Sequence, residues 1–211
     1  MRKTLVIVLG ALLLLPLGAM GAQAAKPDKY DNKFFDAYWN SRRKIDHDTY
    51  LKTTWYSGVY VSGDSSFWSD LYKNTELCHR LDGRDRCHQR ANWYDSIDSL
   101  GSGSFTIDTR LNSGQLTATY ELHDYSARHQ PLVGITAVTV DLVGVGTVTK
   151  STQRYTYSDG CNTYRYSGRS KSRSAEASGT YQIGTDAARN FGTSDDSTMS
   201  AGTSIEVSHT C

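Results

Sequence analysis

Residues 103–122 read GSFTIDTRLNSGQLTATYEL, and apolar and polar side chains alternate on both sides of a central turn. The apolar side takes every second position, with Phe105, Ile107 and Leu111 before the turn and Leu116, Ala118, Tyr120 and Leu122 after it. Successive side chains of a β-strand point to opposite faces, so this period of two predicts two strands with one buried face. Asn112-Ser113-Gly114 supplies the turn between them.

The same texture continues to the C-terminus, with turn residues every 8 to 15 positions and no pattern of a long helix. The stretch LVGITAVTVDLVGVGTVT (132–149) is apolar almost throughout, which is typical of a central strand. Residues 101–211 are therefore predicted to form an antiparallel β-sandwich of about seven strands. The run VGVGTV within this stretch shares glycines with dinucleotide-binding loops, but strand residues follow it instead of a helix, so no cofactor is expected.

A tyrosine-rich hairpin is predicted around Ser158-Asp159-Gly160. Four tyrosines fall on one side of it: Tyr155, Tyr157, Tyr164 and Tyr166. Two interpretations are open, a platform that stacks against sugar rings and an aromatic face packed into the core. The opposite side carries polar residues such as Arg154 and Arg165, so core packing is the favoured interpretation.

The strand RSAEASGT (173–180) follows this Tyr- and Arg-rich hairpin and precedes a C-terminal strand that ends in Cys211. In these features the last 105 or so residues resemble a loose group of secreted, β-rich actinobacterial proteins without an assigned function. The resemblance implies a sandwich exported by a Gram-positive bacterium, and it implies no activity.

Residues 26–100 are predicted to form a small α+β extension. The aromatic residues Phe34, Phe35, Tyr38 and Trp39 recur at helical spacing, so a short amphipathic helix is expected over 31–44. Residues 50–62 alternate as a strand, and SSFWSDLYKN (65–74) is expected to be a second short helix.

A hairpin stapled by a disulfide is predicted at CHRLDGRDRCH (78–88). Asp82-Gly83 is a strong two-residue turn signal, and with that turn Cys78 faces Cys87 at a distance a disulfide can bridge. Arg80 faces Asp85 and should form a cross-strand ion pair. Cys161 and Cys211 then remain to form a second disulfide.

The first 25 residues have the order of a secretory signal peptide: Arg2 and Lys3, an apolar run over 5–17, and small residues before an expected cleavage after Ala24 or Ala25. Removal of that segment leaves 21 basic against 22 acidic residues, a net charge of −1. This balance gives no general attraction to nucleic acid. A secreted protein without a membrane anchor after cleavage is expected.

Candidate chemical sites are sparse. His79 and His88 lie one diagonal step apart on the predicted hairpin and form a weak metal candidate without a third ligand. The dipeptides His47-Asp48 and His123-Asp124 are weak candidates for acid–base catalysis, because neighbours on a strand point to opposite faces. No complete catalytic motif is present, so an enzyme is not the favoured interpretation.

A basic face is the principal binding candidate. Alternation places Arg165, Arg169, Lys171 and Arg173 on one side of a strand, where they would attract an anionic polymer such as a teichoic acid or an acidic glycan. The leading hypothesis is a secreted, non-catalytic protein that binds a cell-wall polymer, glycan or protein in the cell envelope or the extracellular space. The alternatives are a secreted hydrolase whose acid–base residues converge in the fold, and a structural protein that assembles through its aromatic N-terminal segment.

Overall fold

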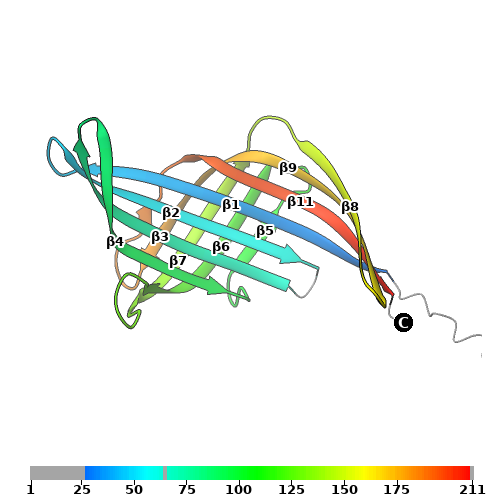
Figure 1. The fold of residues 1–211 in the computed structure, drawn as a ribbon. Helices are drawn as coiled ribbons and strands as arrows, with labels where there is room; N and C mark the ends of the chain where they lie inside the picture. The colour runs from blue at the N-terminus through cyan, green and yellow to red at the C-terminus, as the bar shows by residue number, and fades with distance from the viewer. Residues whose placement is uncertain (1–26, 64–65, 210–211) are drawn as a thin grey trace, which may run out of the picture.

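A computed structural model describes residues 27–63 and 66–209 of the chain (Figure 1). The described residues form eleven strands and no helix, and every strand pair is antiparallel. The strands are β1 (Asp28–Lys44), β2 (Thr49–Ser62), β3 (Ser66–Leu81), β4 (Arg84–Ile97), β5 (Ser104–Ile107), β6 (Ser113–Asp124), β7 (Leu132–Gly144), β8 (Thr149–Asp159), β9 (Asn162–Ile183), β10 (Arg189–Asn190) and β11 (Ser194–His209). The mainly β, antiparallel prediction is confirmed. The described residues form eleven strands and not about seven in all, because residues 28–97, predicted as an α+β extension, add four strands to the seven of residues 104–209. The predicted signal peptide lies outside the described residues.

All eleven strands belong to one sheet. Eight of them pair in a closed circle, which we call the ring. The order β9-β11-β1-β2-β3-β4-β6-β7 returns to β9, because β7 pairs with the second half of β9 at residues 175–183. The expected sandwich of two sheets is thus replaced by one continuous sheet, to which β1–β4 contribute half of the ring. The closure depends on β9, whose 22 residues pair with β11 along one edge and, along the other edge, first with β8 and then with β7.

The two predicted N-terminal helices are wrong, since their residues lie in β1 and β3. The reason is that both faces of these strands carry aromatic side chains, which hides the period of two. In β1, Phe35 and Trp39 are buried inside the ring, whereas Phe34 and Tyr38, each one position before them, point outward. In β3, Phe67 packs against the core while Trp68 is exposed.

The core fills the inside of the closed sheet with buried side chains from seven of the eight strands of the ring. The eighth strand, β4, contributes the partly buried Trp93 and Ile97, which pack against the core. The alternation that predicted β6 is confirmed, because Leu116, Ala118, Tyr120 and Leu122 are all buried. The hydroxyl groups of Tyr120 and Ser69 are hydrogen-bonded at 2.6 Å, and Ser69 also donates to the Gly58 carbonyl at 2.8 Å. The polar atoms of this buried pair are therefore satisfied within the core.

The stapled hairpin between β3 and β4 is confirmed. Asp82 and Gly83 have positive φ angles of 51° and 74°, as a two-residue hairpin turn of this type requires. Cys78 and Cys87 are paired in register, joined by a disulfide, with their Cα atoms 4.0 Å apart. Arg80 Nε lies 3.5 Å from Asp85 Oδ1, which confirms the predicted ion pair.

The remaining two cysteines were predicted to pair with each other. Cys161 is disulfide-bonded, and its predicted partner Cys211 lies outside the described residues.

A curved extension of the sheet, here called the wing, continues beyond the closed ring. It consists of β8, residues 162–172 of β9, residues 200–208 of β11, and residues 28–34 of β1, which pair with 200–206 of β11. In Figure 1 these strands reach out from the ring toward the side where β8 lies. Side chains on the inner side of the wing share the direction of the core residues, and those on the outer side alternate with them.

The tyrosines of the β8–β9 hairpin lie on the outer side of the wing and do not enter the core. Tyr155 and Tyr157 are each 58% exposed and Tyr164 is 45% exposed, so the favoured prediction of core packing is wrong. The reason is that this hairpin extends past the closed part of the sheet, where no second layer of described residues covers it.

Candidate functional site

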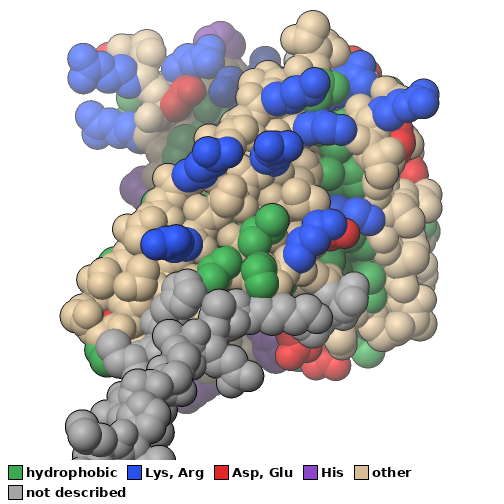
Figure 2. All heavy atoms as spheres, turned by 90° about the vertical axis from the view of Figure 1, so that its right-hand side faces the viewer, with side chains coloured by type: hydrophobic (Ala, Val, Ile, Leu, Met, Phe, Trp, Pro, Cys, Tyr) green, Lys and Arg blue, Asp and Glu red, His purple; other side chains and the backbone are tan. Residues whose placement is uncertain are grey.

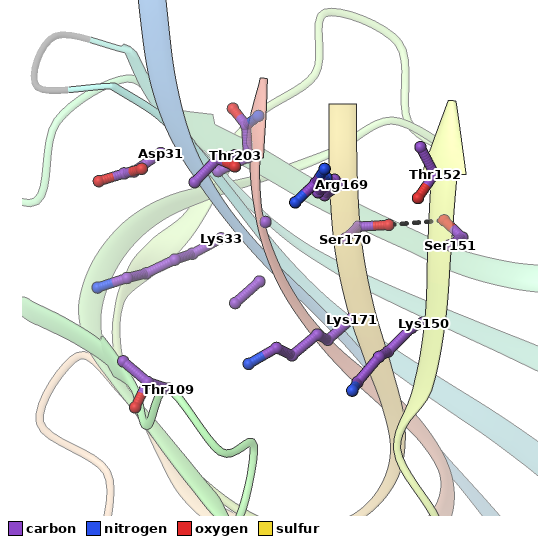
Figure 3. A pocket seen from close by; sticks show the side chains of 13 residues that line it. Asp31, Lys33, Thr109, Lys150, Ser151, Thr152, Arg169, Ser170, Lys171 and Thr203 are labelled. Carbon is purple, nitrogen blue, oxygen red and sulfur yellow. Dashed lines mark hydrogen bonds between the residues drawn. The ribbon is translucent and has the colours of Figure 1, made fainter. Parts of the chain in front are cut away.

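Basic side chains gather on the inner side of the wing. Met199 and Phe35 point into the core, and the residues two positions further out, Ala201 and Lys33, keep the same direction. The neighbouring strands add further cations to this side, which we call the basic face: Lys33 from β1, Lys150 from β8, and Arg169 and Lys171 from β9 (Figure 3). In Figure 3 the side chains of Lys33, Lys150 and Lys171 extend from their strands toward the same space.

A pocket of about 510 Å³ lies over the basic face. Its floor is formed by the small residues Ala201, Gly202 and Thr203 of β11, and Thr109 from the loop between β5 and β6 closes one side of it. The pocket therefore joins the wing to the mouth of the closed sheet. An extended ligand could lie along β9 and reach the loop at Thr109.

Like charges oppose each other directly within the basic face. Lys150 and Lys171 are cross-strand partners in the register of β8 and β9, and like charges placed opposite one another destabilise a sheet. Neither lysine forms an ion pair with a carboxylate among the described residues, and Asp31 is the acidic side chain that lines the pocket. Figure 2, viewed from the side where β8 lies, shows many Lys and Arg side chains on this surface and few Asp and Glu between them. A bound anion would relieve the repulsion.

The four predicted basic residues share the inner side of β9 but have different surroundings. Arg169 and Lys171 line the pocket. Arg173 is held at the mouth of the closed sheet, where its guanidinium donates to Asn112 Oδ1 at 2.7 Å and to the Gly146 carbonyl at 3.1 Å. Arg165 lies near the hairpin end, beside a second hollow lined by tyrosines. Arg173 therefore stabilises the mouth of the closed sheet through these hydrogen bonds, whereas Arg169 and Lys171 can contact a ligand.

Lys33 and Lys150 were not among the predicted site residues. Lys33 was missed because residues 31–44 were expected to be a helix, which placed it in no sheet. Lys150 follows the turn glycine Gly146, and its opposition to Lys171 depends on the length of the β8–β9 hairpin. The sequence did hold an indication of Lys150: it lies four residues before Arg154 on the same strand, and an even separation places both side chains on the polar side of the hairpin.

The predicted acid–base candidates remain apart. His47 Nδ1 lies 2.7 Å from Asp48 Oδ1 in the turn between β1 and β2, but the imidazole is 93% exposed. His123 Nδ1 lies 3.0 Å from the Gln130 carbonyl oxygen, and Asp124 accepts hydrogen bonds from the backbone and hydroxyl of Ser126. These hydrogen bonds lower the pKa of the Asp124 carboxyl. Each dipeptide thus organises its own turn, and the arrangement offers no shared cleft for proton transfer.

The predicted metal candidates have no third ligand in the described part of the chain. His79 Nδ1 lies 3.2 Å from Thr49 Oγ1, and His88 is paired with Leu77 in the sheet. The cluster of potential ligand atoms within 4.8 Å of one another consists of Glu76 with Cys78 and Cys87, whose sulfur atoms are already joined in the disulfide. A disulfide sulfur is not a thiolate ligand, so this cluster does not suit a metal ion.

Two other places in the sheet hold ionisable groups in unusual surroundings. Lys73 Nζ lies 3.5 Å above the ring centre of Trp93 and 5.2 Å from that of Trp55, and burial lowers its pKa to about 8. On the outer face, Asp36 and Asp70 flank Gly58 in the register of β1, β2 and β3, and burial raises the pKa of both carboxyls. Neither place contains a predicted residue.

Within residues 27–63 and 66–209, no helix has the length and apolar character needed to cross a bilayer. Comparison of the chain with protein-family models and with curated proteins returned no match.

Proposed function

We propose that this chain is a secreted, non-catalytic binding protein that holds an extended anionic polymer of the cell envelope or extracellular space on its basic face. One observation carries the proposal: Lys33, Lys150, Arg169 and Lys171 surround one pocket of about 510 Å³ without a carboxylate ion pair among the described residues. Side chains that only kept the protein soluble would not need to converge from three strands. The whole chain is nearly balanced in charge, so a local excess of cations is not explained by the overall composition and favours a binding site.

The length of the cationic surface favours a polymer over a small anion. Arg165 lies six residues from Lys171 along β9, on the same side of the strand, so the inner side of the wing carries positive charge over roughly 20 Å. Arg154 of β8 lies within this stretch, opposite Ser167. A chain with a repeated phosphate or carboxylate group could contact several of these cations in turn.

Secretion is supported by the leader-like order of residues 1–25 and by the disulfide between Cys78 and Cys87. Disulfides persist mainly in oxidising compartments outside the cytosol. An anionic cell-wall polymer or acidic glycan would be within reach of a protein in that location.

Equilibrium binding of the mature protein to poly(glycerol phosphate) and to polygalacturonate, measured at several salt concentrations, tests the proposal. The two polymers separate phosphodiester from carboxylate recognition, and dextran serves as an uncharged comparison. We expect affinity for at least one polyanion to fall as salt rises, because binding releases condensed counterions. Replacement of Lys150 and Lys171 by glutamine should weaken binding and reduce the magnitude of the salt slope by about two.

The matched control is the double variant Arg84→Gln/Arg86→Gln, which removes the same charge from the exposed end of β4. It should bind like the parent protein. Equal losses in the two double variants would mean that only net charge matters, and that result would overturn the assignment of the basic face. Absence of binding to both polyanions at low salt would overturn the proposed function itself.

A further inference from the structure

The outer side of the wing is chemically unlike the basic face on its inner side. It carries the four tyrosines of the β8–β9 hairpin, and Tyr155 and Tyr166 stack with ring centres 4.7 Å apart and planes 17° apart. Where the wing meets the ring, the outer side adds Phe34, Tyr60 and Trp68, which are aligned across β1, β2 and β3. Tyr60 is 45% exposed and Trp68 is 51% exposed. Exposed rings on one continuous face of a sheet form a stacking surface.

Two hollows make this surface a groove. The first, of about 420 Å³, is lined by Tyr155, Tyr157, Tyr164 and Tyr166. The second, of about 210 Å³, is lined by Tyr166, Phe34 and Tyr60. Tyr166 belongs to both hollows, so they meet at its ring. We call the combined feature the aromatic groove.

Glycine keeps the floor of the aromatic groove open. A Cβ atom at Gly168 would lie 2.6 Å from Tyr166 Oη, closer than real Cβ atoms come to other heavy atoms. The ring of Tyr166 therefore lies over Gly168 in a position that a larger residue would exclude. Gly202 continues the floor of the second hollow on β11.

The polar groups along the aromatic groove are mostly uncharged. Asn32, Gln153, Ser170 and Ser200 line the second hollow, and the Ser151 and Ser170 hydroxyls are hydrogen-bonded at 2.8 Å on this side of β8 and β9. Lys33 and Arg169 also border this hollow, but alternation directs their side chains to the basic face. Asp28 and Glu206 border the first hollow and offer hydrogen-bond acceptors.

The length of the aromatic groove suits a chain. Tyr164 and Ser172 of β9 are eight residues apart, and Ser172 is level with Phe34 through Ser200 of β11. At the rise of a β-strand this separation is roughly 26 Å, so several rings of a linear ligand could be accommodated.

From these features we propose that the aromatic groove binds an unbranched neutral glycan chain. The apolar face of a pyranose ring packs on tyrosine and tryptophan rings, and its hydroxyl groups pair with amides, hydroxyls and carboxylates at the edge. The lining holds carboxylates and uncharged polar groups, which can accept and donate hydrogen bonds to a neutral chain, whereas the basic face on the opposite side suits a polyanion. A second copy of the protein is a poorer occupant, because the tyrosine hydroxyls and serines would have to be desolvated in a dry interface.

Calorimetric titration of the mature protein with cellohexaose, chitohexaose and maltohexaose tests this proposal. Binding of at least one of these neutral oligosaccharides is expected, with little dependence on salt because no ion pair is involved. Tyr166→Ala and Tyr60→Ala, at two residues that line the groove, should each weaken that binding by about tenfold. Tyr166→Phe should retain most of the affinity, because it keeps the stacking ring.

The matched control is Tyr125→Ala, which removes an exposed tyrosine just after β6 whose ring makes an edge-to-face contact with Tyr94 and lines neither hollow of the groove. It should leave oligosaccharide binding unchanged, and the circular dichroism of all variants should match that of the parent. No binding of any of the three oligosaccharides would overturn the proposal, as would equal weakening by Tyr125→Ala. Sedimentation that shows a dimer abolished by Tyr166→Ala would assign the groove to a second copy and would likewise overturn it.

Discussion

At the scale of single residues, Lys73 shows how the interior of the closed sheet acts on an ionisable group. Its ammonium lies against Trp93 and Trp55, and a small pocket beside it is bordered by Arg189 and Asp186. Burial and, to a smaller extent, the positive charge of Arg189 disfavour the protonated amine, so its pKa falls to about 8. Below that pH the folded protein carries a charge that the sheet tolerates poorly.

The pKa of Lys73 predicts a pH-dependent contribution to stability. The pKa of Lys73 is lower in the folded state than in the unfolded state, so between about pH 8 and pH 10.5 the unfolded state binds more protons than the folded state. The contribution of Lys73 to the free energy of unfolding therefore rises with pH over this range. Lys73→Met should therefore favour folding most, relative to the parent, at about pH 7 and least at about pH 10. Urea unfolding of both proteins at the two pH values measures this difference. A difference that stays constant with pH would show that the amine titrates as in the unfolded chain.

Residue patterns predicted local chemistry well where neighbours in sequence are also neighbours in space. Asp82-Gly83 predicted a two-residue turn, and the register set by that turn predicted that Cys78 faces Cys87. The same method could not find Lys33 beside the predicted Lys171, because these residues are joined through β11, which lies between β9 and β1 and far from Lys33 in the sequence. Contacts made by chain closure leave no local signature.

At the scale of elements, the period of two was readable only where one face of a strand is polar. β6 was predicted because its buried and exposed positions differ in polarity at every step. β1 was mistaken for a helix because Phe34 and Phe35, one outside and one inside the ring, are equally aromatic. Phe34, one of the outward aromatic residues that caused this error, lines the aromatic groove.

The stapled hairpin between β3 and β4 makes a prediction at this scale. The double variant Cys78→Ser/Cys87→Ser should lose about 2.7 kcal/mol of unfolding free energy, because a short loop is no longer closed in the unfolded chain. Amide hydrogen exchange should show faster opening of the ends of β3 and β4 near the turn, while β6 and β7 keep their protection. The serine variant leaves Cys161 oxidised, which makes it a cleaner probe than a reductant. Uniform loss of protection across β6 and β7 would contradict a local staple.

At the scale of the whole molecule, the ring is closed at one place by very few backbone pairs. β4 and β6 share only the pairs Trp93 with Asp124 and Tyr94 with His123 in register. A side chain extends this seam, since Asp95 Oδ2 accepts a hydrogen bond from the Glu121 backbone N–H at 2.7 Å. This seam thus has the fewest backbone pairs in the ring, whose other neighbouring strands pair over many residues.

From this hydrogen bond we predict that Asp95→Ala lowers the free energy of unfolding by about 1 kcal/mol, because the Glu121 backbone N–H loses its side-chain acceptor at an exposed site. Replacement of the nearby exposed Asp98 by alanine should have little effect and serves as the control. Thermal unfolding of the three proteins followed by circular dichroism measures the change. Equal stability of the Asp95→Ala variant and the parent would mean that Asp95 does not support the closure.

The closed sheet and its wing together give one molecule with a cationic inner side and an aromatic outer side on the same strands. NMR titration of isotope-labelled protein with poly(glycerol phosphate) at low salt identifies directly which of the two sides binds a polyanion. We predict that amide shifts concentrate at Lys33, Lys150, Arg169 and Lys171 and at Thr109 across the pocket, while the β3–β4 hairpin at 84–86 stays unchanged. Shifts confined to that hairpin, or spread evenly over all exposed lysines and arginines, would contradict the central claim that the basic face is a built binding site.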